Sequence, residues 1–226
     1  MFKKSIPTLI TLLNLACGFL AIVLNQVELG SYLILLGMLL DTFDGWAARK
    51  LNVESEIGKQ LDSLADIITF GAAPAYLYLQ LAPDYDYFMM IPSVIYVMAS
   101  AYRLAKFNTL PSKKTFTGLA TPAGALFLIG ILLSHSISVD FIQILYGNVV
   151  IYFIIPIVLA LLLNSNIEMF SLKSLERPFH KNIFHIITLI VFIISVVIAP
   201  TLSPTITIFA YILLSIIENL LNPKTI

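Results

Sequence analysis

Long apolar runs constrain this chain more than any other feature of its sequence. A helix needs about twenty apolar residues to cross the hydrocarbon layer of a bilayer. Runs of about that length recur, and we expect spans at roughly residues 6–25, 30–49, 60–82, 86–106, 118–137, 147–163, 183–199 and 203–221. With 59% hydrophobic and 12% charged residues, the chain is far more apolar than a typical soluble domain. The sequence therefore predicts an all-α integral membrane protein, a bundle of about eight transmembrane helices.

The basic residues predict the orientation of this bundle. All 13 lysines and arginines fall at the N-terminus, in the loops after the second, fourth and sixth predicted spans, or at the C-terminus. The alternate loops carry acidic residues instead. Because loops rich in lysine and arginine stay on the cytoplasmic side, we expect both termini in the cytoplasm and the protein in the plasma membrane.

The domain organisation follows from the lengths of the polar stretches. These are too short to form a core of their own. We therefore expect a single membrane domain over residues 1–226, with core spans at about 6–163 and two additional C-terminal spans at about 183–221. The single cysteine, Cys17, excludes an intramolecular disulfide and is predicted to be a small buried side chain.

Four aspartates lie where the second and third predicted spans meet the cytoplasm: Asp41, Asp44, Asp62 and Asp66. Pairs at i,i+3 and i,i+4 project from one face of a helix, and the short connecting loop makes the two helices neighbours. An aspartate inside a span costs about 2.5–3.5 kcal/mol on insertion scales, and converging anions also repel one another. Divalent cations would neutralise them, and ligands that are all oxygen favour Mg²⁺, Mn²⁺ or Ca²⁺ over zinc.

The residues around the aspartates favour a phosphorylated substrate. Gly45 and Ala48 share the helical face of Asp41 and leave space beside it. Arg49 follows at the cytoplasmic edge, where a guanidinium can grip a phosphate with two hydrogen bonds. A two-metal clamp on an in-line phosphoryl displacement would use such a geometry. Two alternatives use the same carboxylates: ordinary solvated side chains at helix ends, and a cation transport path.

The segment from Asp41 to Asp66 resembles the signature of the CDP-alcohol phosphotransferase family. It matches the pattern Asp-x2-Asp-Gly-x2-Ala-Arg-x8-Gly-x3-Asp-x3-Asp at every fixed position. Within that family, "FGAAPA" (70–75), "RLAKFN" (103–108) and "FTGLATPAG" (116–124) are similar to the membrane-embedded phosphatidylserine synthases. The chain departs from their pattern at Thr8, Lys106 and Ala120.

The resemblance implies transfer of the phosphatidyl group of CDP-diacylglycerol to the hydroxyl of L-serine, with release of CMP and no nucleic-acid partner. It implies two divalent cations, Mg²⁺ or Mn²⁺ with Ca²⁺ as a substitute. Asp41 and Asp62 would bridge the ions, Asp44 would complete the first site, and Asp66 would bind the second and act as general base. The expected contacts to the CDP-lipid are Thr8, Thr11, Asn14, Gly45, Arg49 and Ser55.

The acceptor site is expected at the cytoplasmic ends of the fourth and fifth spans. Arg103 is the first candidate to hold the serine carboxylate, with Lys106 and Asn108 beside it and Lys113 and Lys114 in the same cluster. The resemblance also implies a homodimer. Two rival functions stay open: a sister enzyme with another acceptor, such as glycerol 3-phosphate or inositol phosphate, and a cation transporter.

Overall fold

The computed structural model describes residues 2–83, 86–109, 116–136, 147–170 and 183–221, without the side chains of residues 2–4, 116 and 136. Within these residues, helices occupy each of the eight ranges in which spans were predicted. Residue 137, the predicted end of the fifth span, lies outside the described residues. The helices are α1 (Phe2–Leu24), α2 (Val27–Leu51), α3 (Glu56–Asp66), α4 (Ala73–Leu79), α5 (Ile91–Thr109), α6 (Thr121–Ser136), α8 (Val149–Leu163), α9 (Ile183–Ile198) and α10 (Ser203–Leu221).

Two short helical segments of other types complete the third and fourth predicted spans. The π-helix η1 (Ile67–Ala72) joins α3 to α4, so the chain from Glu56 to Leu79 is one continuous helical rod. The 3₁₀-helix η2 (Tyr87–Met90) leads directly into α5. A tight turn separates the last two helices: α9 ends at Ile198, and the hydroxyl of Ser203 donates to the carbonyl of Pro200 (2.8 Å).

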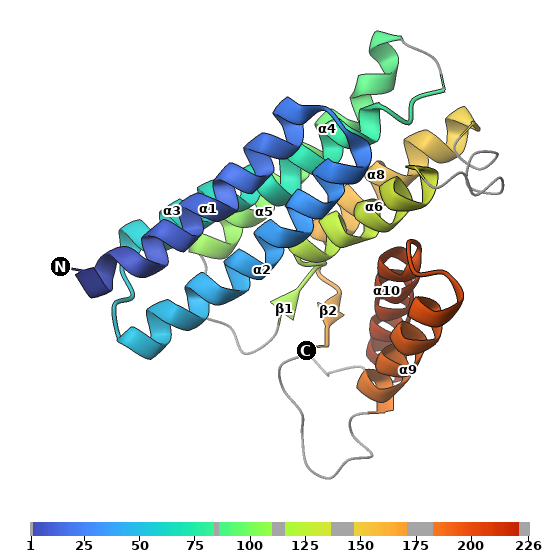
Figure 1. The fold of residues 1–226 in the computed structure, drawn as a ribbon. Coiled ribbons are helices and arrows are strands. Elements are labelled where there is room, and N and C mark those ends of the chain that lie inside the picture. The colour runs from blue at the N-terminus through green and yellow to red at the C-terminus, as the bar shows by residue number, and fades with distance from the viewer. Residues whose placement is uncertain (1, 84–85, 110–115, 137–146, 171–182, 222–226) are drawn as a thin grey trace.

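The helices from α1 to α8 form one tilted bundle, and the hairpin of α9 and α10 stands at an angle beside it (Figure 1). α1 packs along α2 and against α3, α5 packs against α8, and α10 joins the hairpin to the bundle through α6. α1 therefore lies next to both α2 and α3, the two helices that carry the four aspartates.

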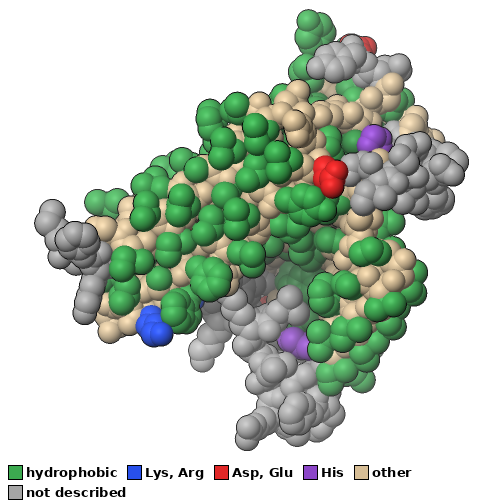
Figure 2. All heavy atoms as spheres, in the orientation of Figure 1, with side chains coloured by type: hydrophobic (Ala, Val, Ile, Leu, Met, Phe, Trp, Pro, Cys, Tyr) green, Lys and Arg blue, Asp and Glu red, His purple; other side chains and the backbone are tan. Residues whose placement is uncertain are grey.

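The composition of the helices is that of an integral membrane protein. Ser5–Leu24, Tyr87–Thr109 and Ser203–Leu221 are long and apolar enough to cross a membrane, and Thr121–His135, Val149–Leu163 and Ile183–Ile198 are shorter apolar helices. The distribution of side chains agrees, because large hydrophobic residues such as Leu9, Phe19 and Val197 are exposed. Hydrophobic side chains cover much of the face seen in Figure 2. A lipid-facing surface has this character, because lipid tails are as apolar as a protein core.

Two glycines inside spans mark close helix contacts. A Cβ on Gly124 of α6 would lie 2.8 Å from the hydroxyl of Tyr96 on α5. Gly130 lies against Thr205 of α10, with no space for a side chain between them. Small residues let neighbouring helices approach each other in membranes, so these positions set the spacing of α6 from its neighbours.

One feature departs from a purely helical fold. β1 (Phe116–Thr117) pairs antiparallel with β2 (Glu168–Met169), in register Phe116 with Met169 and Thr117 with Glu168. The residue after β1, Gly118, has a φ of +72°, and a Cβ there would lie 2.5 Å from the carbonyl oxygen of Leu163. This small ladder ties the loop before α6 to the loop after α8.

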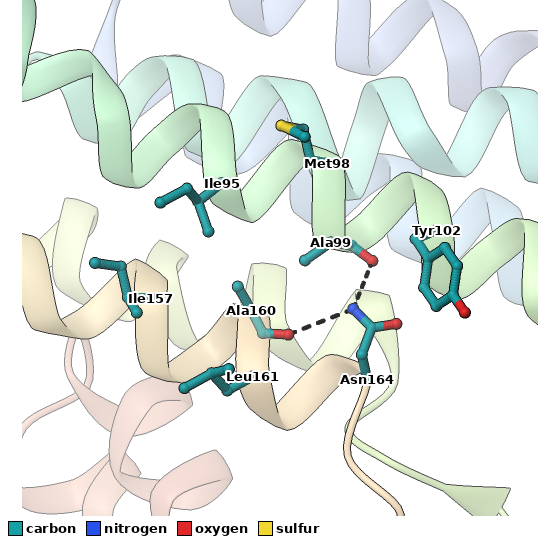
Figure 3. A pocket seen from close by; sticks show the side chains of 8 residues that line it. All are labelled: Ile95, Met98, Ala99, Tyr102, Ile157, Ala160, Leu161 and Asn164. Atoms are coloured by element: carbon teal, nitrogen blue, oxygen red, sulfur yellow. Dashed lines mark hydrogen bonds between the residues drawn. The ribbon is translucent and has the colours of Figure 1, made fainter.

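An apolar groove lies on the surface between α5 and α8 (Figure 3). At one end, the side-chain amide of Asn164 donates to the carbonyls of Ala99 (3.0 Å) and Ala160 (3.4 Å) and so links the two helices. None of the four aspartates lines it; the lining residues are Ile95, Met98, Ala99, Tyr102, Ile157, Ala160, Leu161 and Asn164.

Candidate metal centre

The turn between α2 and α3 brings the aspartates to one depth. The residue after α2, Asn52, adopts a left-handed conformation (φ 53°). Its backbone N–H donates hydrogen bonds to the carbonyls of Ala48 and Arg49 and so caps the helix. Asparagine tolerates this conformation better than most residues, which makes it a suitable helix stop. Ser55 then caps α3, because its hydroxyl oxygen accepts a hydrogen bond from the N–H of Gly58 (3.1 Å). The chain reverses within four residues, and both helices pack against α1.

Three of the four aspartates meet at one point. Asp41, Asp62 and Asp66 each offer a carboxylate oxygen, and these oxygens lie within 4.8 Å of one another. Asp66 is buried, and Asp41 and Asp62 are half-buried. Three such carboxylates in one small volume repel one another strongly unless a cation lies between them.

The donor set fits a hard divalent cation. Every ligand candidate in the cluster is a carboxylate oxygen, which is the ligand type that Mg²⁺, Mn²⁺ and Ca²⁺ prefer. Among the residues that the structure describes, the Oδ1 atom of Asp62 is buried with no hydrogen-bond partner. Buried polar atoms usually have a partner, and a metal ion would supply one here. The cluster could therefore bind metal ions.

Asp44 lies beside this group rather than within it. Its side chain is buried, and its Oδ2 atom accepts a hydrogen bond from the hydroxyl of Thr11 on α1 (2.6 Å). It is close enough to Asp62 for the two charges to interact. The structure thus brings Asp44 next to the cluster, and its role as a metal ligand stays a prediction.

Helix α1 closes one side of the cluster and carries three of the residues predicted to contact the CDP-lipid, a contact that stays a prediction. Thr11 and Asn14 are both buried, and the side-chain amide of Asn14 donates a long hydrogen bond to Oδ1 of Asp66 (3.4 Å). These two residues are three apart, so they project from one face of α1. Thr8, one turn earlier, has an exposed side chain.

Three residues predicted to contact the CDP-lipid lie near the C-terminal end of α2 or just before α3. A Cβ on Gly45 would lie 3.3 Å from Nη1 of Arg49, so the guanidinium folds back over this glycine. Ser55 uses its hydroxyl oxygen to cap α3. Arg49 and Ser55 are exposed, and their contacts to a CDP-lipid stay predictions.

The predicted acceptor residues reach in different directions. Nη1 of Arg103 donates to the carbonyls of Leu163 (2.8 Å) and Thr117 (3.2 Å), which joins α5 to α8 and β1. Asn108 instead reaches the aspartate-bearing helix, where its Nδ2 atom donates to the hydroxyl of Ser63 (2.8 Å). Lys106 is half-buried near the end of α5. The further candidates Lys113 and Lys114 lie outside the described residues.

Two residues at the site were missed from the sequence. Ser63 follows Asp62 and contacts Asn108, and Thr69 donates a hydrogen bond to the backbone carbonyl of Asn14 (2.9 Å). Thr69 gives one weak signal, since it is a polar residue inside the apolar run "DIITFGAAPA". Ser63 gives none, because a single serine beside an acidic residue has no distinctive pattern.

The fold is that of a helical membrane protein with a carboxylate cluster that could bind metal ions, and comparison with known proteins assigns the chain to a family. The family model described as CDP-alcohol phosphatidyltransferase matches residues 4–194. The chain belongs to the CDP-alcohol phosphatidyltransferase family.

Individual relatives agree with this assignment. The chain is 41% identical over 127 residues to a CDP-diacylglycerol–serine O-phosphatidyltransferase of Methanocaldococcus jannaschii, and the match covers 56% of this chain and 59% of that protein. It is 40% identical over 129 residues to the protein of the same name in Bacillus subtilis, covering 55% of this chain and 73% of the relative. It is also 38% identical over 128 residues to an archaetidylserine synthase of Methanothermobacter thermautotrophicus, covering 54% of each. The matches therefore span about half to three quarters of these relatives.

Proposed function

We propose that this protein transfers the phosphatidyl group of CDP-diacylglycerol to the hydroxyl of L-serine, giving phosphatidylserine and CMP. The observation that carries the proposal is the meeting of Asp41, Asp62 and Asp66 within 4.8 Å, at the family's signature positions. Relatives named for this reaction in an archaeon and a bacterium support serine as the acceptor.

In the proposed reaction, the serine hydroxyl oxygen attacks the phosphorus that carries the diacylglycerol. The new bond to serine forms as the bond from that phosphorus to the CMP oxygen breaks, and CMP leaves with the electron pair. Asp66 accepts the hydroxyl proton, since it lies at the buried edge of the cluster and a general base must be within hydrogen-bond reach. Two Mg²⁺ or Mn²⁺ ions, held by Asp41, Asp44, Asp62 and Asp66, would stabilise charge on the attacking and leaving oxygens.

The donor is proposed to bind along the cytoplasmic end of α2. Gly45 lies one turn after Asp41, and the guanidinium of Arg49 lies over Gly45. From this position the guanidinium can contact a pyrophosphate oxygen. Thr11 and Asn14 hold Asp44 and Asp66 from the α1 side. Thr8 and Ser55 complete the proposed contacts at the exposed rim.

The acceptor is proposed to enter from the side of α5. The hydrogen bond of Asn108 to Ser63 supports this, because it brings the end of α5 to the residue that follows Asp62 in the sequence. Arg103 and Lys106 would supply positive charge for the serine carboxylate. Since Nη1 of Arg103 already bonds two carbonyls, only the remaining guanidinium nitrogens could serve this purpose.

The site is proposed to face the cytoplasm of a plasma-membrane protein whose termini are both cytoplasmic. The described basic residues Arg49, Lys50 and Lys59 lie around the turn at the aspartate end of α2 and α3. At the opposite end, Gln80 donates a hydrogen bond to Asn25 (2.8 Å), and the acidic Glu28 is nearby in sequence. This asymmetry agrees with the positive-inside rule.

Two further expectations belong to the proposal. The family resemblance leads us to expect a homodimer, which the mass of the protein in detergent would test. We also propose that residues 1–226 form one membrane domain, with core spans at about 6–163 and two additional spans at about 183–221.

The deciding experiment uses purified protein, CDP-diacylglycerol, Mg²⁺ or Mn²⁺, and a panel of acceptors, with CMP release as the readout. Release only with L-serine supports the proposal. Release with glycerol 3-phosphate or inositol phosphate alone would replace it with a sister reaction. Ion flux without CDP-lipid, and no CMP, would favour the transporter instead.

The lipid part of the donor needs its own comparison. One similar relative is named archaetidylserine synthase, so an archaetidyl donor is a second candidate. The same assay with CDP-diacylglycerol and CDP-archaeol side by side decides between them by the ratio of kcat/KM for the two donors.

A further inference from the structure

The helix that carries Asp66 changes type directly after this residue. α3 ends at Asp66, the π-helix η1 covers Ile67–Ala72, and α4 continues from Ala73. A π-helix accommodates more residues per turn than an α-helix and shifts the face on which the following side chains emerge. Such segments are frequent at functional sites. The backbone directly after Asp66 therefore departs from α-helical geometry, and contacts with neighbouring helices must stabilise it.

Thr69, in the middle of η1, is fixed in a notch between α1 and α2. Its side chain is fully buried. A Cβ on Gly18 of α1 would lie 2.6 Å from the Cα of Thr69, and a Cβ on Gly37 of α2 would lie 2.6 Å from its Cγ2. Only glycine allows this approach from both helices, so Thr69 has little space in which to shift.

Asn14 connects Thr69 to Asp66. The backbone carbonyl of Asn14 accepts the hydrogen bond from the Thr69 hydroxyl (2.9 Å), and its side-chain amide donates to Asp66 (3.4 Å). On another side of η1, the hydroxyl of Tyr96 donates to the carbonyl of Phe70 (3.2 Å). Hydrogen bonds from α1 and α5 thus hold the segment that follows the carboxylate.

We propose that Thr69 is a positioning residue for the metal centre. Its hydroxyl holds η1 against α1, and this contact fixes the carboxylate of Asp66 relative to those of Asp41 and Asp62. The inference rests on the metal site of the proposed function, and it assigns Thr69 no contact with substrate. Residues that orient metal ligands in this way typically change metal affinity by about 10–100-fold when they are replaced.

The test measures Mn²⁺ binding to the purified full chain in lipid nanodiscs without substrate, from the loss of the free Mn²⁺ EPR signal. Thr69→Val keeps the shape of the side chain and removes the hydroxyl, and Thr69→Ser restores the hydroxyl. We expect Thr69→Val to weaken Mn²⁺ binding by about tenfold or more, and Thr69→Ser to stay close to wild type. Equal losses in the two variants would contradict a role for the hydroxyl.

A matched control is available in α9. Thr188 is also buried, and its hydroxyl donates to a helix carbonyl, that of Phe184 (2.8 Å), but α9 packs against α10 rather than the cluster. Thr188→Val should therefore leave Mn²⁺ binding unchanged. A similar loss in this variant would mean that any lost hydroxyl perturbs the fold, and it would overturn the inference.

A second pair of variants keeps the test decisive if Thr69→Val does not fold. Gly18→Ala pushes against both the backbone and the hydroxyl of Thr69 without removing the hydroxyl, whereas Gly130→Ala disturbs the α6–α10 contact instead. Weaker Mn²⁺ binding in Gly18→Ala, but not in Gly130→Ala, supports the inference. Wild-type binding in Gly18→Ala overturns it.

The proposed function can fail separately. A wild-type protein that binds Mn²⁺ but releases no CMP with any acceptor contradicts the proposed reaction and leaves the role of Thr69 standing. A wild-type protein that binds no Mn²⁺ overturns the role of Thr69, whatever its activity with serine.

Discussion

The hydroxyl of Thr11 donates a 2.6 Å hydrogen bond to the carboxylate of Asp44, and this bond joins α1 to α2 at the edge of the acidic cluster. The two residues are 33 positions apart, and both are buried. A hydrogen bond to a charged group contributes about 1.5–3 kcal/mol, so this contact matters for the orientation of Asp44.

Replacing Thr11 with valine should therefore lower kcat/KM for CMP release by about tenfold or more, because Asp44 loses the hydroxyl that donates a hydrogen bond to it. Thr11→Ser should retain most of the activity, since it keeps the hydroxyl. Steady-state kinetics of the two variants checks the expectation. Equal activity of the valine variant and wild type would show that this bond does not support catalysis.

Asp66→Asn should remove turnover while CDP-diacylglycerol still binds. The amide cannot accept the hydroxyl proton, and loss of a general base typically costs about 10²–10⁴-fold in rate. CMP release and donor binding are measured on the same preparation. Asp86→Asn is the control, because Asp86 is exposed and precedes η2 at the opposite end of the bundle. Substantial turnover in Asp66→Asn would contradict the assignment of the base.

Removal of divalent cations should abolish CMP release. Without a cation, the carboxylates of Asp41, Asp62 and Asp66, whose oxygens lie within 4.8 Å of one another, repel one another and the pyrophosphate. Excess chelator is expected to stop the reaction, and added Mg²⁺ or Mn²⁺ to restore it. Full activity in the presence of chelator would rule out metal-dependent chemistry at this cluster.

Asn108→Ala should raise the KM for serine and leave the KM for CDP-diacylglycerol within about twofold. The loss of one hydrogen bond of about 1 kcal/mol corresponds to a factor of about five in the KM for serine. Asn166→Ala is the control, since Asn166 is an exposed asparagine in the loop before β2. A rise in the KM for the donor alone would place Asn108 on the nucleotide side of the site.

The orientation can be tested by cysteine labelling in a Cys17→Ala background. Glu54 and Gln26 are both exposed and lie in turns at opposite ends of α2. In intact cells, a membrane-impermeant maleimide should label Gln26→Cys and should not label Glu54→Cys. The reverse pattern would place the acidic cluster on the outer face of the membrane.

Much of the fold could be predicted because the lipid environment leaves few alternatives. In a bilayer, backbone groups must bond within their own segment, so each apolar run of sufficient length becomes a helix. The described helices accordingly overlap the predicted ranges, from α1 (Phe2–Leu24) to α10 (Ser203–Leu221), with ends that differ by a few residues. The pairing of Phe116–Thr117 with Glu168–Met169 was not predicted, because two-residue strands have no periodic pattern.

The site was predicted in part, for a reason visible in Asp44 and Thr69. The spacing of the aspartates along two helices places them at one depth, and three of them do meet. Spacing does not indicate which carboxylates bond α1; the structure shows that Asp44 bonds Thr11 and Asp66 bonds Asn14. Nor does spacing indicate a π-helix after Asp66, since i to i+5 hydrogen bonds leave no mark in an apolar sequence.

By itself, the sequence determined that the chain is a helical membrane protein with four carboxylates on two consecutive helices. Hydrophobicity and helical periodicity are local properties, and they can be read along the chain. Only the tertiary structure decided that Asn14 of α1 touches both Asp66 and Thr69, and that Asn108 of α5 reaches Ser63. These contacts join segments 45 to 55 residues apart, and they depend on how whole helices pack.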